Sequence, residues 1–544
     1  MTRILALGLA AWLAAGCAHQ ETSTTAQAPA RPKLVVLLVV DGFPQRQLVD
    51  YRDQLAPDGF ARFLERGTWF ADAHYGQAFT VTAAGHAVLL TGAYPNRTGI
   101  IGNDWRNNAT GEIEYCTGDA AHKYIGHETK KLDGTSPRNL KVETLGDVLR
   151  GIDPASKVVA ISGKDRGAIL PGGHKGTAYM YQSATGHFAS TTYYMKEHPK
   201  WVSDFNAGNP AHAYFRAEWK PLLPEAAYAK SLPDAQTWYF KGGALPKAIG
   251  EGDKPAAPFY AQLLPTPFSD RLTLDFARAA IAGEGLGRDA TPDILAVSLS
   301  GHDYVNHAYG SESRVSHDHV LHLDRALQDF FRHLDQKVGR DGYVVALTAD
   351  HGFMPAPEYS MSLGHKAGRQ SGSQTLARIN KALSTKYGQG EWVRYFSARG
   401  AVLNRSTLAV ANQNVDTLAE EVRLLLLDEP GVAAAYTRSQ ITSRSAAGQP
   451  YFQQVVRTWH PELSGDVEFV LRPYWMMTST SSLTTHGSPH PYDSHVPVAF
   501  YGPAWVKAAR RDERAEVADI APTLARILGV RAPAASEGRA HTLR

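Results

Sequence analysis

The sequence predicts an α/β fold, in which a mostly parallel sheet is sandwiched by helices. Short runs rich in Val, Leu and Ile recur along the chain and end in polar residues or glycine, which is typical of strands buried on both faces. Helical patterns lie between these runs, and strands that alternate with helices build α/β sheets. The composition, 43% hydrophobic and 20% charged over 544 residues, is that of a folded globular protein.

The strands and helices are expected in the following places. The strands are Lys33–Val40, Lys157–Ile161, Asp293–Leu299, Tyr343–Leu347 and, near the end, Val496–Tyr501. The helices include Gly59–Gly67, His319–Leu334 and Val517–Leu528, the last of which is closed by Gly529. Ligands of open α/β sheets bind beyond the carboxyl ends of the strands, so the polar residues that follow these runs are candidate site residues.

Two segments interrupt this alternation. The segment from about 167 to 290 is rich in Tyr, Trp, Pro and Gly and has weak periodicity, which predicts an inserted cap. The segment from about 370 to 480 has strand patterns and a helical pattern, Asp416–Leu427, of its own, which predicts a small α+β subdomain. We therefore expect a catalytic domain at residues 33–544 with two insertions.

The N-terminus is typical of an exported protein. Residues 1–17 contain Arg3, an apolar run from Ile4 to Ala15 and a small-residue end at Cys17, and they are too short for a membrane span of about 20 residues. Cys17 has two interpretations, lipidation as in a bacterial lipoprotein or plain signal cleavage. Residues 18–32 are expected to be a flexible tether. We predict secretion across the inner membrane, to the periplasm or as an outer-membrane lipoprotein, with membrane contact only through the lipid anchor.

Charge and cysteine content exclude several classes of function. Lys and Arg number 56 against 53 Asp and Glu, a net charge of +3 that gives no basic footprint for nucleic acid. Two cysteines exclude a disulfide scaffold and a Cys-rich zinc site. Partners therefore have to be inferred from individual sites.

Aspartate and histidine side chains follow several of the predicted strands. Asp303 and His307 are four residues apart, so on a helix they share a face and could hold one cation. The other segments are Asp41-Gly42, Asp350-His351-Gly352 and a His-rich stretch from 485 to 495. Three Asp and three His from distant segments suit two divalent ions such as zinc.

The chain has 22 histidines, and most are expected to have other roles. His317, His319 and His322 are spaced so that they could bind a metal, but a solvated helix face is the favoured interpretation. His302 is expected to point away from its neighbour Asp303 on a helix.

Thr82 is a candidate nucleophile. It precedes Ala83-Ala84-Gly85, at the predicted start of a helix. The positive end of the helix and a zinc ion could lower the pKa of its hydroxyl enough to give an alkoxide. The alternative role is a simple helix N-cap.

Six segments between residues 39 and 503 carry a family resemblance. They are VVDGF, TAAGHAVLLTGAYPNRTGIIGNDW, SGKDRGAILPGG, SLSGHDYVNHAYG, LTADHGF and THGSPHPYDSHVPVAFYGP. In this order they form a specific set that resembles the alkaline phosphatase superfamily, and within it the nucleotide pyrophosphatase/phosphodiesterase branch. More narrowly, the chain is similar to secreted bacterial single-chain alkaline phosphatases with a Thr nucleophile. The resemblance implies an alkaline phosphatase-like fold.

The resemblance also implies two zinc sites. One would use Asp303, His307 and His486, and the other Asp41, Asp350 and His351, with Thr82 contacting the second. His486 is chosen over His490 and His495, which would lie beside the ligands. Further calcium or magnesium ions are compatible with the acidic loops, although no dedicated loop motif is present.

The implied reaction is hydrolysis of small-molecule phosphate monoesters. Asn103, Lys164 and Arg166 match residues that bind phosphate oxygens, and two cations favour a monoester dianion over a diester. Thr82 would attack phosphorus to give a phosphothreonine, which water then hydrolyses, while two zinc ions stabilise the attacking and leaving oxygens. The predicted enzyme is therefore an alkaline phosphatase.

Two alternatives remain open at this point. A phosphodiesterase or nucleotide pyrophosphatase would use the same metal site. A non-catalytic metal-binding lipoprotein on the same fold would be expected to lack ligands, and none of the six is missing.

Overall fold

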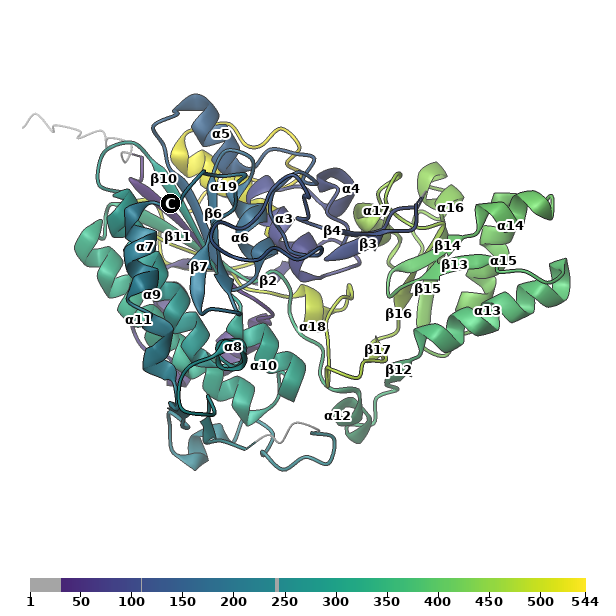
Figure 1. The fold of residues 1–544 in the computed structure, drawn as a ribbon, viewed down its shortest axis with the longest axis horizontal. Helices are drawn as coiled ribbons and strands as arrows, with labels where there is room; N and C mark the ends of the chain where they lie inside the picture. The colour runs from purple at the N-terminus through teal and green to yellow at the C-terminus, as the bar shows by residue number, and fades with distance from the viewer. Residues whose placement is uncertain (1–30, 109, 240–243) are drawn as a thin grey trace, which may run out of the picture. The chain divides into compact units, whose positions relative to one another are not determined.

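The computed structural model describes residues 31–108, 110–239 and 244–544 (Figure 1). The predicted signal peptide, Cys17 and most of the predicted tether lie outside the described residues. No helix within the described ranges is long and apolar enough to cross a membrane.

A nine-stranded sheet carries the main hydrophobic core, and its strand order is β19-β2-β18-β11-β1-β10-β5-β6-β7. Its strands are β1 Leu34–Val40, β2 Thr68–His74, β5 Val158–Ser162, β6 Thr177–Gln182, β7 His187–Ala189, β10 Asp293–Leu299, β11 Tyr343–Thr348, β18 Val498–Tyr501 and β19 Ala509–Glu516. Strands β11, β1, β10, β5 and β6 run parallel to one another. Their carboxyl ends therefore meet at one edge of the sheet.

The centre of the sheet explains why apolar runs form these strands. All seven residues of β1 are buried, and the strand lies in register between β10 and β11, with Val36 opposite Leu295 and Val345. A strand that is covered on both faces needs apolar side chains at every position rather than at alternate ones. The predicted runs at β1, β5, β10 and β11 end within one residue of the observed strands.

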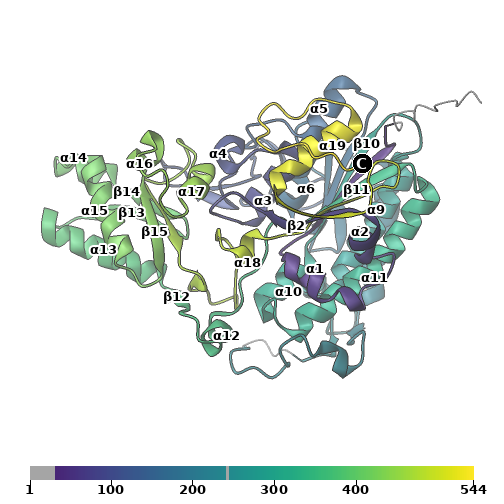
Figure 2. The same ribbon diagram turned by 180° about the vertical axis from the view of Figure 1, so that it is seen from behind.

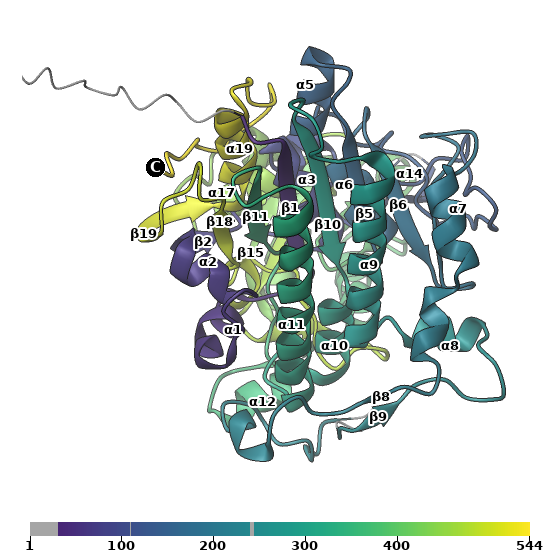
Figure 3. The ribbon, with the colours of Figure 1, turned by 90° about the vertical axis from the view of Figure 1, so that its left-hand side faces the viewer.

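Helices cover both faces of the sheet. Figures 1 and 3 show α7, α9 and α11 on one face and α3 and α6 on the other. The helices of this part are α1 Gln45–Asp50, α2 Ala61–Arg66, α3 Thr82–Thr91, α4 Pro95–Thr98, α5 Leu145–Ile152, α6 Asp165–Gly172, α7 Lys200–Ala207, α8 Ala257–Gln262, α9 Pro267–Glu284, α10 Gly301–Tyr309, α11 Arg314–Lys337, α12 Pro357–Ser362, α18 Pro491–Ser494 and α19 Ile520–Leu528. The predicted α/β class with a mostly parallel sheet is confirmed.

Two features of the sheet differ from the sequence prediction. The fifth predicted strand, β18, runs antiparallel to both of its neighbours, β11 and β2. Strands β2, β6, β7 and β19 were not predicted. Six of the eight residues of β19 are charged and half are exposed, because it is an edge strand and lacks the continuous apolar run of a central one.

A second sheet with its own core lies within the segment for which a small α+β subdomain is predicted. Its order is β13-β14-β16-β15, and Figure 2 shows α13 and α15 packed on it. The elements are α13 Gly372–Tyr387, β13 Val393–Phe396, β14 Gly400–Leu403, α14 Arg405–Val410, α15 Val415–Leu427, β15 Val432–Thr437, α16 Arg438–Ser443, α17 Phe452–Thr458 and β16 Val467–Leu471. We refer to it as the small sheet. Its hydrophobic core, which includes Trp392 and Val422, is separate from that of the main sheet.

The segment 167–290 contributes to two kinds of structure. Strands β6 and β7 belong to the main sheet and α9 packs beside it, whereas β8 Glu218–Trp219 and β9 Lys247–Ala248 form a two-stranded sheet. Two further small sheets join β3 Asp104–Arg106 to β4 Ile113–Tyr115 and β12 Gly368–Gln370 to β17 Trp475–Met477. The role of 167–290 as a cap stays a prediction.

Candidate active site

Three aspartates meet at the carboxyl edge of the main sheet. Asp41 directly follows β1, Asp350 follows β11, and Asp303 lies in the first turn of α10, just after β10. These three strands are neighbours, so their ends bring the carboxylates together, and all three side chains are buried. The topology of the sheet therefore places the predicted acidic ligands in one cluster.

Two groups of side chains at this edge are close enough to hold metal ions. The potential ligand atoms of Asp41, Asp350 and His351 lie within 4.8 Å of one another, and so do those of Asp303, His351 and His486. The Nε2 atom of His307 lies 3.4 Å from Asp303 Oδ1, next to the second group. The structure thus brings all six predicted ligands together, and it places His351 between the two groups.

The protonation of the three imidazoles suits metal binding. His307 Nδ1 donates to the carbonyl of Thr484 at 3.0 Å, His351 Nδ1 to that of Gly352 at 2.9 Å, and His486 Nδ1 to that of Thr80 at 2.9 Å. A carbonyl can only accept, so each Nδ1 carries a proton, and Nε2 is the nitrogen that could offer its lone pair to a metal. The Nε2 atoms of all three lie 3.4 to 4.0 Å from Asp303 Oδ1. Second partners that fix the tautomer in this way are typical of metal-ligating histidines.

The carboxylates fit a cation for a second reason. Asp41 Oδ1 and Asp303 Oδ1 are buried and have no hydrogen-bond partner among the described residues. A buried carboxylate oxygen without a donor is costly unless a cation or a proton compensates it. Burial, followed by the charge of Asp350, raises the pKa of Asp41 well above its usual value. The donor set of carboxylates and imidazoles is one that zinc accepts.

Lys164 lies among these carboxylates. It precedes α6 at the end of β5, and its Nζ is 2.8 Å from Asp41 and 2.5 Å from Asp303. Burial opposes the charge of Lys164, but Asp303 and Asp41 outweigh it and raise the pKa of the ammonium. Burial likewise opposes ionisation of Asp303, yet Lys164 and the nearby imidazoles hold its pKa well below the usual range. The cluster therefore keeps an ammonium next to both candidate metal groups.

Thr82 is the first residue of α3 rather than its N-cap, a position that Val81 occupies. Its Oγ1 is buried and lies 3.5 Å from His351 Nε2. The helix can approach this closely because Gly85 has no side chain, since a Cβ there would lie 2.0 Å from the carbonyl oxygen of Asp350. The hydroxyl is thus held at the positive end of a helix and beside the cluster.

The other two predicted phosphate-binding residues flank Thr82 and Lys164. The Asn103 side-chain oxygen accepts a hydrogen bond from the backbone N–H of Ala83 at 2.9 Å, which holds its amide next to the start of α3. Arg166 donates from Nη1 to the hydroxyl of Tyr115 at 3.0 Å, and that hydroxyl donates to Asp165 at 2.6 Å. Lys164 is inside the carboxylate cluster, whereas Arg166 contacts Tyr115 at its side.

His86 is a residue of this site that sequence reasoning missed. Its Nδ1 lies 3.2 Å from Asp350 Oδ2 and donates to the carbonyl of Thr82 at 2.8 Å. Its Nε2 lies 2.8 Å from the Ser298 hydroxyl. The ring therefore links Asp350 to the start of α3. The available signal was its spacing, because residues four apart share a helix face and His86 follows Thr82 by four.

The structure differs from the sequence prediction for several other histidines and agrees with it for His302. His317 and His319 are fully buried rather than on a solvated face: α9 covers His319, and Tyr51 and Tyr228 cover His317. His302 does point away from the cluster: its Nδ1 is 3.2 Å from His319 Nδ1. His490 and His495 are not placed beside the ligands, since their Nε2 atoms bind the carbonyls of residues 471 and 71.

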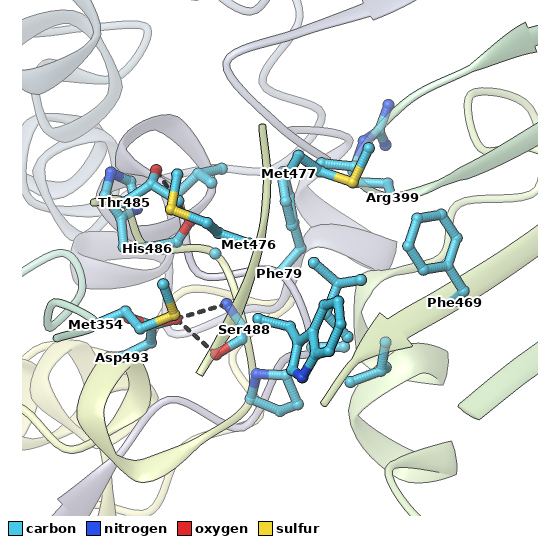
Figure 4. A pocket seen from close by; sticks show the side chains of 18 of the residues that line it. Phe79, Met354, Arg399, Phe469, Met476, Met477, Thr485, His486, Ser488 and Asp493 are labelled. Carbon is cyan, nitrogen blue, oxygen red and sulfur yellow. Dashed lines mark hydrogen bonds between the residues drawn. The ribbon is translucent and has the colours of Figure 1, made fainter. Parts of the chain in front are cut away.

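A cavity of about 360 Å³ opens beside the cluster (Figure 4). His307, His486 and Asn103 line it on the side of the main sheet. Phe469 of the small sheet, Met477 of β17 and other apolar side chains form much of the rest. A group attached to a phosphate held near Thr82 would find this space next to it.

Comparison with known proteins places this geometry in a family. The model of the type I phosphodiesterase/nucleotide pyrophosphatase family matches residues 35–493. The chain belongs to this family. Among its relatives is the alkaline phosphatase PafA of Elizabethkingia meningoseptica, which is 34% identical over 516 residues, 94% of each chain. Another is the alkaline phosphatase PhoV of Synechococcus elongatus, 33% identical over 536 residues, 96% of this chain and 95% of PhoV.

Solved structures of PafA have the same fold as this member of the type I phosphodiesterase/nucleotide pyrophosphatase family. The wild-type structure has a TM-score of 0.88 at 34% identity and covers 95% of this chain and 99% of its own. A second structure is that of a PafA variant, with a TM-score of 0.87 at 33% identity. In that variant a threonine is replaced by serine, and an asparagine, a lysine and an arginine are each replaced by alanine. The resemblance recognised in the sequence is thus confirmed.

Proposed function

We propose that this protein hydrolyses phosphate monoesters through a phosphothreonine formed at Thr82, at a site that holds two zinc ions. The chain is an alkaline phosphatase enzyme, as its relatives of nearly full length are. The observation that carries the proposal is the set of three imidazoles around Asp303, with Thr82 Oγ1 only 3.5 Å from one of them.

The proposed metal ligands are the two groups at the sheet edge. Asp303, His307 and His486 would hold one ion, and Asp41, Asp350 and His351 would hold the other, next to Thr82. Bound zinc would supply positive charge that stabilises oxyanions and lowers the pKa of hydroxyl groups nearby. The buried carboxylate oxygens without donors and the fixed Nδ1 protons are what the chain itself provides for such ions.

The reaction proceeds in two displacements at phosphorus. The Thr82 oxygen forms a bond to phosphorus, the bond to the leaving oxygen breaks, and the hydroxyl proton is lost to solvent. Water then attacks the phosphothreonine, the bond between Thr82 and phosphorus breaks, and phosphate and the free hydroxyl are released. The position of Thr82 at the start of α3 favours its oxyanion through the helix dipole.

Asn103, Lys164 and Arg166 are the proposed phosphate-binding residues. The Asn103 amide is fixed beside Thr82 by its bond from Ala83, and Lys164 places an ammonium beside both metal groups. The four residue types that are substituted together in the PafA variant, Thr, Asn, Lys and Arg, occur here in the same order. This parallel supports their assignment to one functional unit.

The test compares monoester and diester turnover. Lys164→Ala with Arg166→Ala removes two charges that a dianionic monoester uses more than a diester does. We expect turnover of an aryl monoester to fall at least about 100-fold, because each charged hydrogen bond contributes roughly 1.5–3 kcal/mol, and that of a bis-aryl diester to change far less. A matched control is Lys200→Ala, an exposed lysine that pairs with Asp204 on α7. A wild-type preference for the diester would contradict the proposal.

A phosphodiesterase remains the second candidate, and one observation favours it. The cavity beside His486 is lined by apolar side chains and would accept a second ester substituent. Under that hypothesis the double variant would lose little activity towards its preferred substrate. A metal-binding protein without activity, the third interpretation, predicts no turnover that a chelator abolishes.

We also propose that residues 1–17 direct export. Mass spectrometry of the mature N-terminus distinguishes the two forms, since lipidation would leave a modified Cys17 as the first residue and plain cleavage would not.

A further inference from the structure

The cavity beside the cluster has two chemically different ends. Figure 4 shows His486 at one side of it and Arg399 at the other. The cavity is also lined by apolar side chains: Phe79, Met354, Met476, Met477, Phe469 and Trp475. Met354 and Phe79 come from loops of the main sheet, and the others from the small sheet and β17. A substrate group that spans the cavity from His486 would meet a polarisable, largely apolar wall and, on the opposite side, a cation.

Arg399 lies in the turn between β13 and β14 and has no counter-ion in place. Its Nη1 is buried without a hydrogen-bond partner among the described residues, and no ion pair within 4.0 Å is formed by its guanidinium there. Its nearest aromatic neighbour is Phe79, whose ring centre is 5.9 Å from the guanidinium carbon. A cation whose buried donor has no partner is costly, and an anionic ligand would compensate it.

Two carboxylates face Arg399 without pairing with it. Burial lowers the pKa of Arg399, and the charges of Glu468 and Asp104 offset this only in part. Burial also raises the pKa of Glu468, whose Oε1 accepts from Gly465 at 3.3 Å, so its negative charge is disfavoured. Arg399 therefore has carboxylates nearby but no direct partner among the described residues, and its Nη1 donor is available to an anionic ligand.

We propose that Arg399 is a specificity-determining residue that binds an anionic group at the distal end of the leaving group. The substrate class is a phosphate monoester whose leaving group is apolar or aromatic next to the phosphate and carries a carboxylate or a second phosphate farther out. This inference rests on the proposed function, because it places the phosphate at Thr82 and the leaving group in the cavity.

Contacts on both sides of the cavity support this direction of binding. Arg399 reaches the segment that carries Asn103, since a Cβ at Gly102 would lie 3.6 Å from its Nε. Asn103 and His486 line the same cavity as Arg399. The guanidinium thus lies beside the segment that carries Asn103 and comes from a separate part of the chain.

The experiment uses two aryl phosphates that differ in one charge. We compare 4-carboxyphenyl phosphate with 4-carbamoylphenyl phosphate, which has the same shape but no distal negative charge, in the zinc-loaded full chain. The wild-type protein is expected to prefer the carboxylate. Arg399→Ala should lower the carboxylate-to-carboxamide ratio of kcat/KM about tenfold or more, through KM rather than kcat, because a charge-assisted hydrogen bond is lost.

Controls separate this role from a structural one. Arg399→Lys keeps the charge and should retain part of the preference. Arg394→Ala removes an exposed arginine of β13 that stacks on Tyr395 and should leave the ratio unchanged. In Arg399→Ala, inhibition by the product 4-hydroxybenzoate should weaken as the carboxylate-to-carboxamide ratio of kcat/KM falls.

The outcomes distinguish the two hypotheses. If both substrates are hydrolysed and Arg399→Ala leaves their ratio unchanged, the role of Arg399 is refuted while the proposed function stands. If neither aryl phosphate is hydrolysed by the wild-type protein, the proposed function fails and the role of Arg399 falls with it. An Arg399→Ala protein that lowers turnover of both substrates equally would indicate a structural role and overturn the proposal.

Discussion

Substitution of Asp270 is expected to loosen the helix that carries two of the proposed ligands. Asp270 is a buried residue of α9, and its Oδ1 accepts from the backbone N–H of Gly301, the first residue of α10, at 3.0 Å. Its Oδ2 lies 3.3 Å from His319 Nε2. Asp303 and His307 follow on the same helix, so a change at Asp270 acts on them through the start of α10.

The size of the effect follows from these contacts. Asp270→Ala leaves the Gly301 N–H buried without an acceptor, which costs about 1–3 kcal/mol. The void left by the carboxyl group adds on the order of 1 kcal/mol. Removal of the carboxyl group also removes the cost of burying its ionised form, which offsets part of this loss of stability. That cost is real because burial raises the pKa of Asp270 to about 7. We expect a net loss of about 2–3 kcal/mol, which is large against a total stability of roughly 5–15 kcal/mol.

Urea unfolding with chelator present measures the free energy, and Asp270→Asn is the matched control. Asparagine keeps the acceptor oxygen for Gly301 and fills the same volume, so its loss should be under about 1 kcal/mol at neutral pH. Zinc titration should show affinity about 10–100-fold weaker for the alanine variant. Equal stability of the alanine and asparagine variants, or wild-type stability of the alanine variant, would refute the reasoning.

Asp270 also predicts a dependence of stability on pH. Its pKa of about 7 in the folded protein lies above the ordinary 3.8, so the folded state binds the proton more tightly. The stabilisation that the protonated Asp270 carboxyl gives the folded state is therefore fully present below about pH 4, and it is lost as the pH rises through about 7. The difference in unfolding free energy between wild type and Asp270→Asn should fall over this range, and urea titrations from pH 4 to about 8 measure it. A constant difference would contradict the raised pKa.

Three further outcomes are expected. Thr82→Ala should abolish the phosphoprotein trapped by acid quenching and nearly all turnover, and near-normal turnover would contradict the role of Thr82. Chelation should abolish activity and added zinc restore it, whereas recovery with only magnesium or calcium would exclude zinc. Arg62→Met should lower the unfolding free energy by about 1–3 kcal/mol, because Arg62 is buried and pairs with Asp335 at 3.1 Å, whereas Arg340 and Tyr343 still bind that carboxylate. Urea unfolding measures this loss, and kcat of the folded protein should not change.

Much of the fold could be predicted because central parallel strands have a local signature. The runs that became β1, β10 and β11 are mostly apolar and buried at every position, and the residues just after them lie at a common edge of the sheet. This is why Asp41, Asp303 and Asp350 could be placed together without knowing the strand order. The histidines His307, His351 and His486 were harder to assign to one metal group or the other. The position of His351 between both groups could not be predicted from the sequence, since it depends on distances between separate loops.

The remaining features depend on contacts that leave no local pattern. The direction of β18 is set by its pairing with β11 and β2, and an antiparallel strand buried on both faces has the same composition as a parallel one. His319 was expected in solvent because its neighbours are polar, yet the packing of α9 on α11 buries it. Arg399 lies in a segment far from any motif, so only the folded chain brings it to the cavity.

The separation of the two hydrophobic cores has a consequence for how such enzymes diverge. The small sheet has its own core, and it supplies the Arg399 and Phe469 wall of the cavity, whereas the phosphate-facing side belongs to the main sheet. Substitutions in the small sheet can therefore accumulate without disturbing the packing behind Thr82 and the carboxylates. Natural selection acting on this one segment can change which organic group is accepted while the chemistry at phosphorus is inherited unchanged.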